Sequence, residues 1–366
     1  MGNQNCHAVI VFEDEVEWLG RFRLSWTLAP PQDVRNRTLR SEAATLTYLQ
    51  RHTSIPVPRV FDWACDTDPA NGIGVSYILM EKLAGRSLDW CSITTAEKDK
   101  ITCQLVDMLL EIRSHPFKAK GSLVFSTTTA TGFDVQSLAS HTVFHPESCD
   151  PVGPFSSSRQ GWRAVLESYA ARIRRGEIQT RCLADFYVAH MYRLDILESL
   201  WEEGPGEEEF FLKHPDDKGD HILVNDNLDI IGVIDWEWTQ TVSKAEAFAS
   251  PCMMWPVSQF YEGRNQLGMA EQRLAYIFEE RGHEDLANCV RNGRKYQRFF
   301  STLGPDASFH DCKTTRNMIQ GLREALGSEH EQKWKDCQNR VLETLENNGL
   351  QIGLQQPENE AVVNEQ

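Results

Sequence analysis

The chain has 366 residues, enough for about two domains or lobes and a sizeable hydrophobic core. Its 53 acidic against 37 basic residues give a net charge of -16, which argues against nucleic acid and anionic membranes as main partners. The first residues lack the basic-then-apolar pattern of a signal peptide, and no apolar run has membrane-spanning length, so we expect a soluble cytoplasmic protein.

The 10 cysteines are scattered along the chain and form no CxxC pair. Such a distribution is typical of reduced thiols rather than of a disulfide framework or a zinc ribbon. We therefore expect these cysteines to be reduced, in keeping with the cytoplasmic location that the N-terminal sequence predicts.

The first part of the chain has the pattern of a small antiparallel sheet. Strands are predicted at residues 8–13 and 17–24, joined by a tight turn, and two more at 59–64 and 75–82. Between the two pairs, apolar residues recur at helical spacing and predict a helix that ends before the Ile-Pro-Val-Pro run at 55–58. The apolar residues of this helix are Leu39, Ala43, Leu46 and Leu49.

The rest of the chain is mostly helical in pattern. Thr94 and Glu97 form a capping box that opens a helix, and the Ser-, Thr-, Gly- and Pro-rich residues 120–158 predict a long loop. Further helices are predicted at 162–173, 183–201, 265–300, 308–325 and 328–347. An acidic connector at 202–209 is predicted to be solvated, and the polar residues 351–366 are predicted to be a disordered tail.

Residues 210–238 contain the main candidate chemistry. An apolar run leads into His-Pro-Asp-Asp-Lys-Gly-Asp-His at 214–221, and two short β-type runs then flank an Asn-Asp-Asn turn and predict a hairpin. The hairpin would bring its outer ends together, placing Asp216 and His221 beside Asp235. Carboxylates so placed repel one another unless a cation lies between them, so this layout predicts a Mg²⁺–phosphate site.

The order of these residues is specific: HxD, a ligand five residues past the Asp, then a hairpin that ends in Asp. It resembles the catalytic core of the aminoglycoside phosphotransferase family of small-molecule kinases, in a fungal-type member. The resemblance continues at 75–81 and in Arg40-Ser41-Glu42, and it covers roughly residues 8 to 300. It implies an α+β, two-lobed, protein-kinase-like fold, with a small β-rich lobe at about 1–84 and a larger, mostly helical lobe at about 85–350.

The resemblance assigns roles to the central stretch. Asp216 matches the residue that orients the acceptor hydroxyl and accepts its proton, His214 the residue that holds the loop through hydrogen bonds, and Asp235 the metal-chelating residue. His221 stands where the family usually has Asn as a second metal ligand, and imidazole is a poor ligand for Mg²⁺. Asp220 would substitute, or a softer ion such as Mn²⁺ would be used, or the second metal and activity would be lost.

The resemblance also implies an ATP site. Arg21 matches the basic residue that reaches the nucleotide phosphates, although Arg23 lies two residues along on the same strand face and competes for this role. Glu42 borders the apolar stripe of its helix and would pair with Arg21, as the basic–Glu pair does in kinases. At the hinge between the lobes, the Glu81 carbonyl and the Leu83 amide are the candidates for binding the adenine edge.

The phosphate-covering loop is the poorest match. Only residues 1–7 precede the first predicted strand, so the strand that should lead into this loop is absent. Gly2 and Asn5 would be the remnant of a glycine-containing turn. The expectation is that either the chain begins too late or nucleotide binding is impaired.

These features predict an ATP-dependent phosphotransferase that acts on a hydroxyl of a small molecule, with no nucleic acid or membrane partner. One alternative is a catalytically impaired, kinase-like binding protein, which the short glycine loop and His221 favour. Another is a zinc-dependent N-deacetylase, because residues 214–217 also spell its HPDD motif. That motif usually follows an early strand of a parallel-sheet domain, and the first 210 residues lack such alternation. The sequence does not identify the acceptor.

Overall fold

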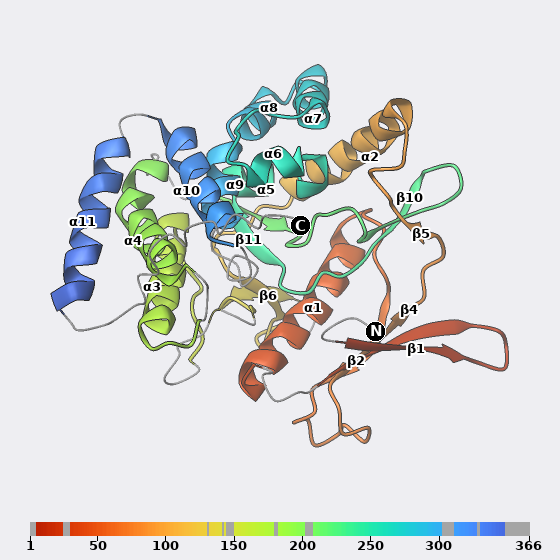
Figure 1. Ribbon diagram of the computed structural model, residues 1–366. Helices are drawn as coiled ribbons and strands as arrows, with labels where there is room; N and C mark the ends of the chain where they lie inside the picture. Colours follow the sequence, from red (N-terminus) through yellow and green to blue (C-terminus); the bar gives the residue numbers. More distant parts are fainter. Residues whose placement is uncertain are drawn as a thin grey trace, which may run out of the picture.

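Figure 1 shows the computed structural model of the chain. It describes residues 5–24, 30–129, 132–140, 143, 150–178, 182–201, 208–301, 311–327 and 330–347. Gly2, most of the predicted acidic connector and the predicted tail lie outside the described residues, so these predictions stay open.

The N-terminal part is an antiparallel sheet in the order β1-β2-β4-β3. Its strands are β1 (Asn5–Val11), β2 (Glu17–Arg23), β3 (Val60–Ala64) and β4 (Tyr77–Glu81). The four predicted strands are therefore confirmed. β1 begins earlier than predicted, because Asn5 pairs with Arg23 and the register continues along the two strands.

Helix α1 (Gln32–His52) lies against this sheet, as its apolar spacing predicts (Figure 1). Leu39 and Ala43 pack with Ile78 and Met80 of the sheet in one small core. The later apolar residues of α1 belong instead to the large core of the C-terminal part. One helix thus contributes to both cores, which fixes the sheet against the rest of the molecule.

The predicted hairpin is present. β9 (Ile222–Val224) and β10 (Ile230–Val233) pair in antiparallel register, and β5 (Arg86–Ser87) extends them to a three-stranded sheet. Helix α2 (Thr95–Arg113) begins with the predicted capping box, in which Thr94 and Glu97 satisfy each other's backbone amides. Buried residues of α2 and of the hairpin share the large core, which packs the hairpin against α2.

Part of the segment predicted as a long loop is a strand pair, so that prediction is wrong in part. β6 (Ser122–Phe125) pairs with β7 (Phe133–Gln136). The small polar residues of the segment 120–158 are typical of loops. The Ser122 hydroxyl of β6, however, is buried and donates to the Thr239 carbonyl. Tertiary partners that the composition does not reveal therefore hold this strand in place. β8 (Phe210–Lys213) and β11 (Gln240–Ser243) form another pair beside it.

Helices make up most of the C-terminal part. α3 (Ser158–Arg174), α4 (Leu183–Leu200), α10 (Cys312–Leu326) and α11 (Glu331–Asn347) share a second core on one side of the molecule (Figure 1). The others are α5 (Lys244–Ala247), α6 (Val257–Tyr261), α7 (Met269–Glu280), α8 (Glu284–Arg291), α9 (Arg294–Ser301) and a 3-10 turn at Cys252–Met254. Within the described ranges, no helix is both long and apolar enough to cross a membrane.

The expectation that all cysteines are reduced is contradicted at one pair. Cys182 and Cys312 form a disulfide, with their Cα atoms 5.4 Å apart. The two residues are 130 positions apart in the sequence and stand at the start of α4 and of α10. Helix packing brings them together, and no local spacing motif could have revealed the pair.

Candidate active site

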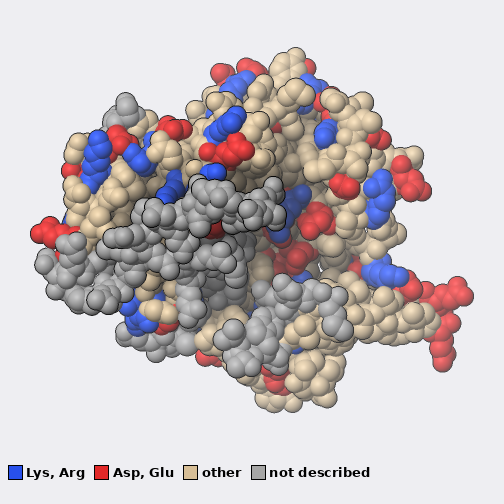
Figure 2. Space-filling model, in the orientation of Figure 1, with Lys and Arg blue, Asp and Glu red and all other residues tan. Residues whose placement is uncertain are grey.

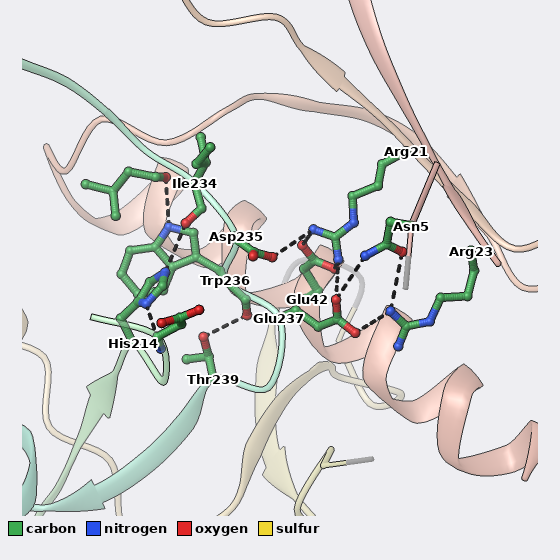
Figure 3. A network of polar contacts seen from close by, with 12 residues as sticks. Asn5, Arg21, Arg23, Glu42, His214, Ile234, Asp235, Trp236, Glu237 and Thr239 are labelled. Atoms are coloured by element: carbon green, nitrogen blue, oxygen red, sulfur yellow. Dashed lines mark hydrogen bonds and ion pairs between the residues drawn. The ribbon is translucent and has the colours of Figure 1, made fainter. Parts of the chain in front are cut away.

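His214 ties the HPDD loop to the end of the hairpin. Its Nε2 donates to the carbonyl oxygen of Ile234 at 2.9 Å, and its Nδ1 accepts the backbone N–H of Asp216 at 3.2 Å. These two contacts require the neutral tautomer with the proton on Nε2. Burial lowers the pKa of His214, which favours the same neutral form. The imidazole thereby ties the backbone at Asp216, the predicted base, to the residue that precedes Asp235, the predicted metal ligand; Figure 3 shows the contact with Ile234.

Asp216 is accessible at the surface of this loop, and Asp217 is not equivalent to it. The side chain of Asp216 is 35% exposed and contacts the Lys218 ammonium at 3.0 Å. Asp217 instead accepts from Lys213 at 3.0 Å and from the backbone N–H of Cys252 at 2.9 Å. Although burial opposes ionisation, these donors hold the pKa of Asp217 below its ordinary value. Asp217 therefore anchors the loop, which leaves Asp216 as the carboxylate that a substrate can reach.

His221, the predicted second metal ligand, packs against His214. It is buried and stacked on His214 with ring centroids 4.2 Å apart, and its Nδ1 faces the backbone N–H of Gly219. Burial, with the nearby His214, lowers the pKa of His221 to about 3. The ring borders a largely apolar cavity of about 90 Å³ under the loop. Asp220, the predicted substitute, is exposed.

Arg21 and Glu42 form the predicted pair. The two terminal nitrogens of Arg21 donate to the two carboxylate oxygens of Glu42 at 2.5 and 2.6 Å, and both side chains are buried. The Nη1 of Arg21 also contacts an Asp235 oxygen at 3.2 Å. Strand β2, helix α1 and the end of the hairpin thus meet at one guanidinium (Figure 3), which joins three residues that lie far apart in the sequence.

Glu237 is a member of this cluster that the sequence analysis did not assign. It is buried, and its Oε2 accepts from Arg21 at 2.7 Å and from the amide of Asn5 at 3.2 Å. Its Oε1 forms an ion pair with Arg23. The sequence does show an acidic residue two positions after Asp235. It does not show that the fold brings this residue into contact with Asn5, Arg21 and Arg23 of the N-terminal sheet.

The electrostatics of the cluster follow from its burial. Burial raises the pKa of the Glu42 carboxyl, and the charges of Glu237 and Asp235 raise it too, whereas the two contacts with Arg21 favour the ionised carboxylate. Three carboxylates here face two guanidiniums, those of Arg21 and Arg23. The cluster carries one more acid than base, so a cation can bind where a carboxylate reaches solvent.

Asp235 is that carboxylate. Its side chain is 55% exposed, whereas those of Glu42 and Glu237 are 2% and 4% exposed. Its backbone has a φ of 62°, the left-handed region that non-glycine residues rarely adopt. Such strain is common at functional sites, and here it accompanies the abrupt end of β10.

The predicted hinge follows β4. Glu81 ends that strand, and its backbone N–H donates to the Arg59 carbonyl at 2.8 Å. The Leu83 side chain lies so close to β10 that a Cβ on Gly232 would come within 2.7 Å of it. Among the described residues the Leu83 amide has no hydrogen-bond partner, so it is free to donate to a ligand in the way the sequence predicts.

The face of the sheet that carries Arg21 also carries exposed valines. Val9 pairs with Leu19, two residues from Arg21 on β2, and so lies on the same face of the strands. Val9 is 48% exposed and Val11, on that face too, 63%. Exposed apolar side chains beside a charged cluster are suited to cover a flat aromatic ligand.

Comparison with known proteins identifies the class. The chain matches the phosphotransferase enzyme family (APH) over residues 15–241, more than half its length, and it belongs to that family. Two Aspergillus fumigatus proteins from different strains, each described as a subtelomeric hrmA-associated cluster protein, are 42% identical to it over 88 residues. The match spans 24% of this chain and only 17% of each relative.

Solved structures agree on the fold. The chain resembles an ethanolamine kinase of Plasmodium vivax with a TM-score of 0.51 at 12% identity, covering 91% of this chain and 82% of that one. It also matches an aminoglycoside phosphotransferase solved with ADP and hygromycin B, with a TM-score of 0.42 at 15% identity over 94% and 91% of the chains. The likeness to the Plasmodium kinase confirms the predicted kinase-like fold, with an N-terminal sheet and a mostly helical C-terminal part.

Proposed function

We propose that this phosphotransferase moves the γ-phosphoryl group of ATP to a hydroxyl of a small molecule. One observation carries the proposal: Arg21 contacts both Glu42 and Asp235, so three residues assigned from separate motifs meet at one point. His214 connects the Asp216 loop to this point, because it binds both the Asp216 amide and the carbonyl that precedes Asp235. This is the set of groups that phosphoryl transfer needs.

In the proposed reaction Asp216 is the catalytic base. Its exposed carboxylate accepts the proton of the acceptor hydroxyl as the new O–P bond forms and the bond to the β-phosphate oxygen breaks, releasing ADP. The Lys218 ammonium, 3.0 Å from Asp216, would offset negative charge on the transferred group. The Leu83 amide and Glu81 carbonyl would bind the adenine edge.

The donor set fits Mg²⁺ only in company with a nucleotide. Among the described residues, no group of three His, Cys, Asp or Glu side chains could hold a metal ion. Mg²⁺ commonly binds through one or two carboxylates and the substrate phosphates, and Asp235 provides such a carboxylate. The bound ion would neutralise charge on the phosphates. The proposal leaves out His221, which is buried and stacked, and Asp220 remains a candidate as an exposed oxygen ligand.

The alternatives differ in what they require. A non-catalytic binding protein would also keep the Arg21–Glu42 pair, so only turnover separates it from an enzyme. The fold argues against the zinc-deacetylase hypothesis. The HPDD motif of such enzymes belongs to a parallel-sheet domain, whereas this chain has a kinase-like fold with antiparallel strand pairs. Asp217, the second Asp of that motif, which would serve as the base of a deacetylase, accepts hydrogen bonds from Lys213 and from the backbone N–H of Cys252.

The decisive variant is Asp216→Asn. It should lower phosphoryl transfer or ATP turnover by about 10²–10⁴-fold, because it removes a general base without changing the size of the side chain. The thermal shift that Mg²⁺-ATP induces should stay within about 1 °C of that of the unmodified chain, since Asp216 is assigned no nucleotide contact.

The matched control is Asp226→Asn in the exposed turn of the hairpin, which should leave both readouts unchanged. Absence of any shift with Mg²⁺- or Mn²⁺-ATP in the unmodified chain would contradict the proposal. A shift without turnover on any hydroxyl acceptor would favour the binding protein instead.

A further inference from the structure

The Glu237 carboxylate contacts three residues of the N-terminal sheet at once. Asn5 and Arg23 are register partners in β1 and β2, and Arg21 lies two residues before Arg23 on the same face. All three point their polar ends at Glu237 (Figure 3). Glu237 comes from the segment after β10, so it joins the N-terminal sheet to the C-terminal part beside the proposed metal ligand.

The charges of the cluster balance in a particular way. The two fully buried carboxylates, Glu42 and Glu237, equal in number the two guanidiniums that they contact. Asp235 is then the acid left without a matching base. Its 3.2 Å contact with Arg21 is longer than any contact of Arg21 with the other two acids. The buried pairs thus leave Asp235 only loosely held.

We propose that Glu237 is a positioning residue that restrains Arg21 and Arg23, and so preserves Asp235 for the metal ion of the nucleotide. This inference rests on the proposed function and names the residue that tunes its metal site. Glu237 touches neither metal nor substrate in this arrangement. It acts by accepting a hydrogen bond from one terminal nitrogen of Arg21 and by neutralising the charge of Arg23.

Removing the charge of Glu237 has a definite consequence. Arg23 then lacks its buried counter-charge, and the Nη2 of Arg21 faces a neutral group. Two guanidiniums would share Glu42 and Asp235, so the pairing of Arg21 with Asp235 would tighten, because a buried charge without a partner is costly. A metal ion would have to displace that pairing before it could bind.

The test is the affinity of Mn²⁺ for the complex of the full chain with ADP, measured from the electron paramagnetic resonance of free Mn²⁺. Glu237→Gln keeps the shape and one acceptor oxygen, and it should weaken Mn²⁺ binding by about tenfold, equivalent to about 1.4 kcal/mol. ADP affinity without metal should change by less than about twofold. The control is Glu198→Gln, in an exposed pair on α4, which should change neither quantity.

Two further variants distinguish positioning from a merely structural role. Arg23→Gln alone leaves an extra buried acid, which draws Arg21 away from Asp235, and Mn²⁺ binding should tighten several-fold. The double variant Arg23→Gln/Glu237→Gln restores the original charge balance and should return Mn²⁺ affinity to within about threefold of the unmodified chain. A structural role predicts that every variant weakens binding, and that the double variant is worst.

The outcomes separate the two proposals. Unchanged Mn²⁺ affinity in Glu237→Gln, or no recovery in the double variant, would overturn the role of Glu237 and leave the proposed function standing. If Glu237→Gln does not fold, weaker Mn²⁺ binding in Arg23→Gln would overturn it equally. Absence of Mn²⁺-dependent ADP binding in the unmodified chain would overturn the proposed function, and this inference with it.

Discussion

His190 is a fully buried histidine in the helical core around α4. Neither of its ring nitrogens has a hydrogen-bond partner among the residues that the structure describes. The ring stacks on Tyr169 with centroids 5.6 Å apart and meets the edge of Phe186 at 4.6 Å. Burial, with the charge of Arg193, holds the pKa of His190 well below its ordinary value. The imidazole therefore serves as a neutral packing group whose polar atoms are unsatisfied.

We expect His190→Leu to stabilise the protein. It replaces two unsatisfied nitrogens with apolar atoms of similar volume, and an unsatisfied buried polar group costs about 1–3 kcal/mol. The free energy of unfolding at pH 7.5, measured in urea, should rise by that amount. A lower value would mean that the aromatic stacking on Tyr169 contributes more than the buried nitrogens cost.

The same variant tests a pH dependence. Because the pKa of His190 is lower in the folded state than in the unfolded chain, the unfolded chain binds more protons below about pH 6.5, and acid destabilises the protein. The advantage of His190→Leu should therefore widen by about 1.4 kcal/mol for each pH unit from 6.5 down to 5. Phe186→Leu, which changes the neighbouring ring without removing a titratable group, should show no such widening.

For single residues, the sequence predicted contacts between two side chains better than contacts among several. The contact of Arg21 with Glu42 was predictable, because strand position and helix periodicity place both side chains on inward faces. Glu237 and Asn5 were not predictable as partners, since their contact depends on how the hairpin sits under the sheet. His221 was assigned a role by position alone, and its stacking on His214 became visible only from the folded loop.

Among the elements, α4 and α10 are joined covalently by Cys182–Cys312. The two helices also share the second core, so the bond crosslinks elements that pack together anyway. A crosslink over a separation of 130 residues restricts the unfolded chain far more than the folded one.

We expect loss of this disulfide to destabilise the chain by about 2–5 kcal/mol, because the long loop gains entropy when it is opened. Urea unfolding of the double variant Cys182→Ala/Cys312→Ala should show this loss, and a reducing thiol should affect only the unmodified chain. Cys91→Ser, at an exposed free cysteine, is the control. Reaction of all 10 cysteines with a thiol reagent in the unreduced, denatured protein would contradict the bond.

Elements with strong local patterns were predicted, and those made by distant partners were not. The hairpin and the capping box of α2 follow from turn residues and periodicity, which act within a few positions. β6 and β7 were predicted as loop, because their stability comes from pairing and from contacts with the segment around Thr239. The disulfide belongs to the same group.

For the whole molecule, the fold class followed from motifs, whereas the boundary between the two parts remains a prediction near residue 84. The acidic net charge is spread over the surface, and Figure 2 shows acids at the projecting tip of β1 and β2, where Glu13, Asp14 and Glu15 are exposed. The buried cluster around Arg21 is an electrostatic link between the N-terminal sheet and the rest of the molecule. Arg21 belongs to the sheet, and its acidic partners come from α1 and from the end of the hairpin.

Arg21→Met tests this electrostatic link. It leaves the buried carboxylates of Glu42 and Glu237 short of a partner, and breaking a buried ion pair from one side costs about 3–5 kcal/mol. We expect the free energy of unfolding in urea to fall by that amount at pH 7.5. Arg163→Met removes an exposed arginine that pairs with the exposed Glu198 and should cost at most about 1 kcal/mol.

The loss in Arg21→Met should also depend on pH, because the stranded carboxyls can neutralise themselves by binding protons. Without Arg21 the folded chain binds protons more tightly than the unfolded one, so the penalty should shrink as the pH falls from 8 towards 5. A penalty that is the same at both ends would show that Arg21 stabilises the molecule through its packing alone. The ion pairs of Arg21 would then not be what attaches the N-terminal sheet to the helical part.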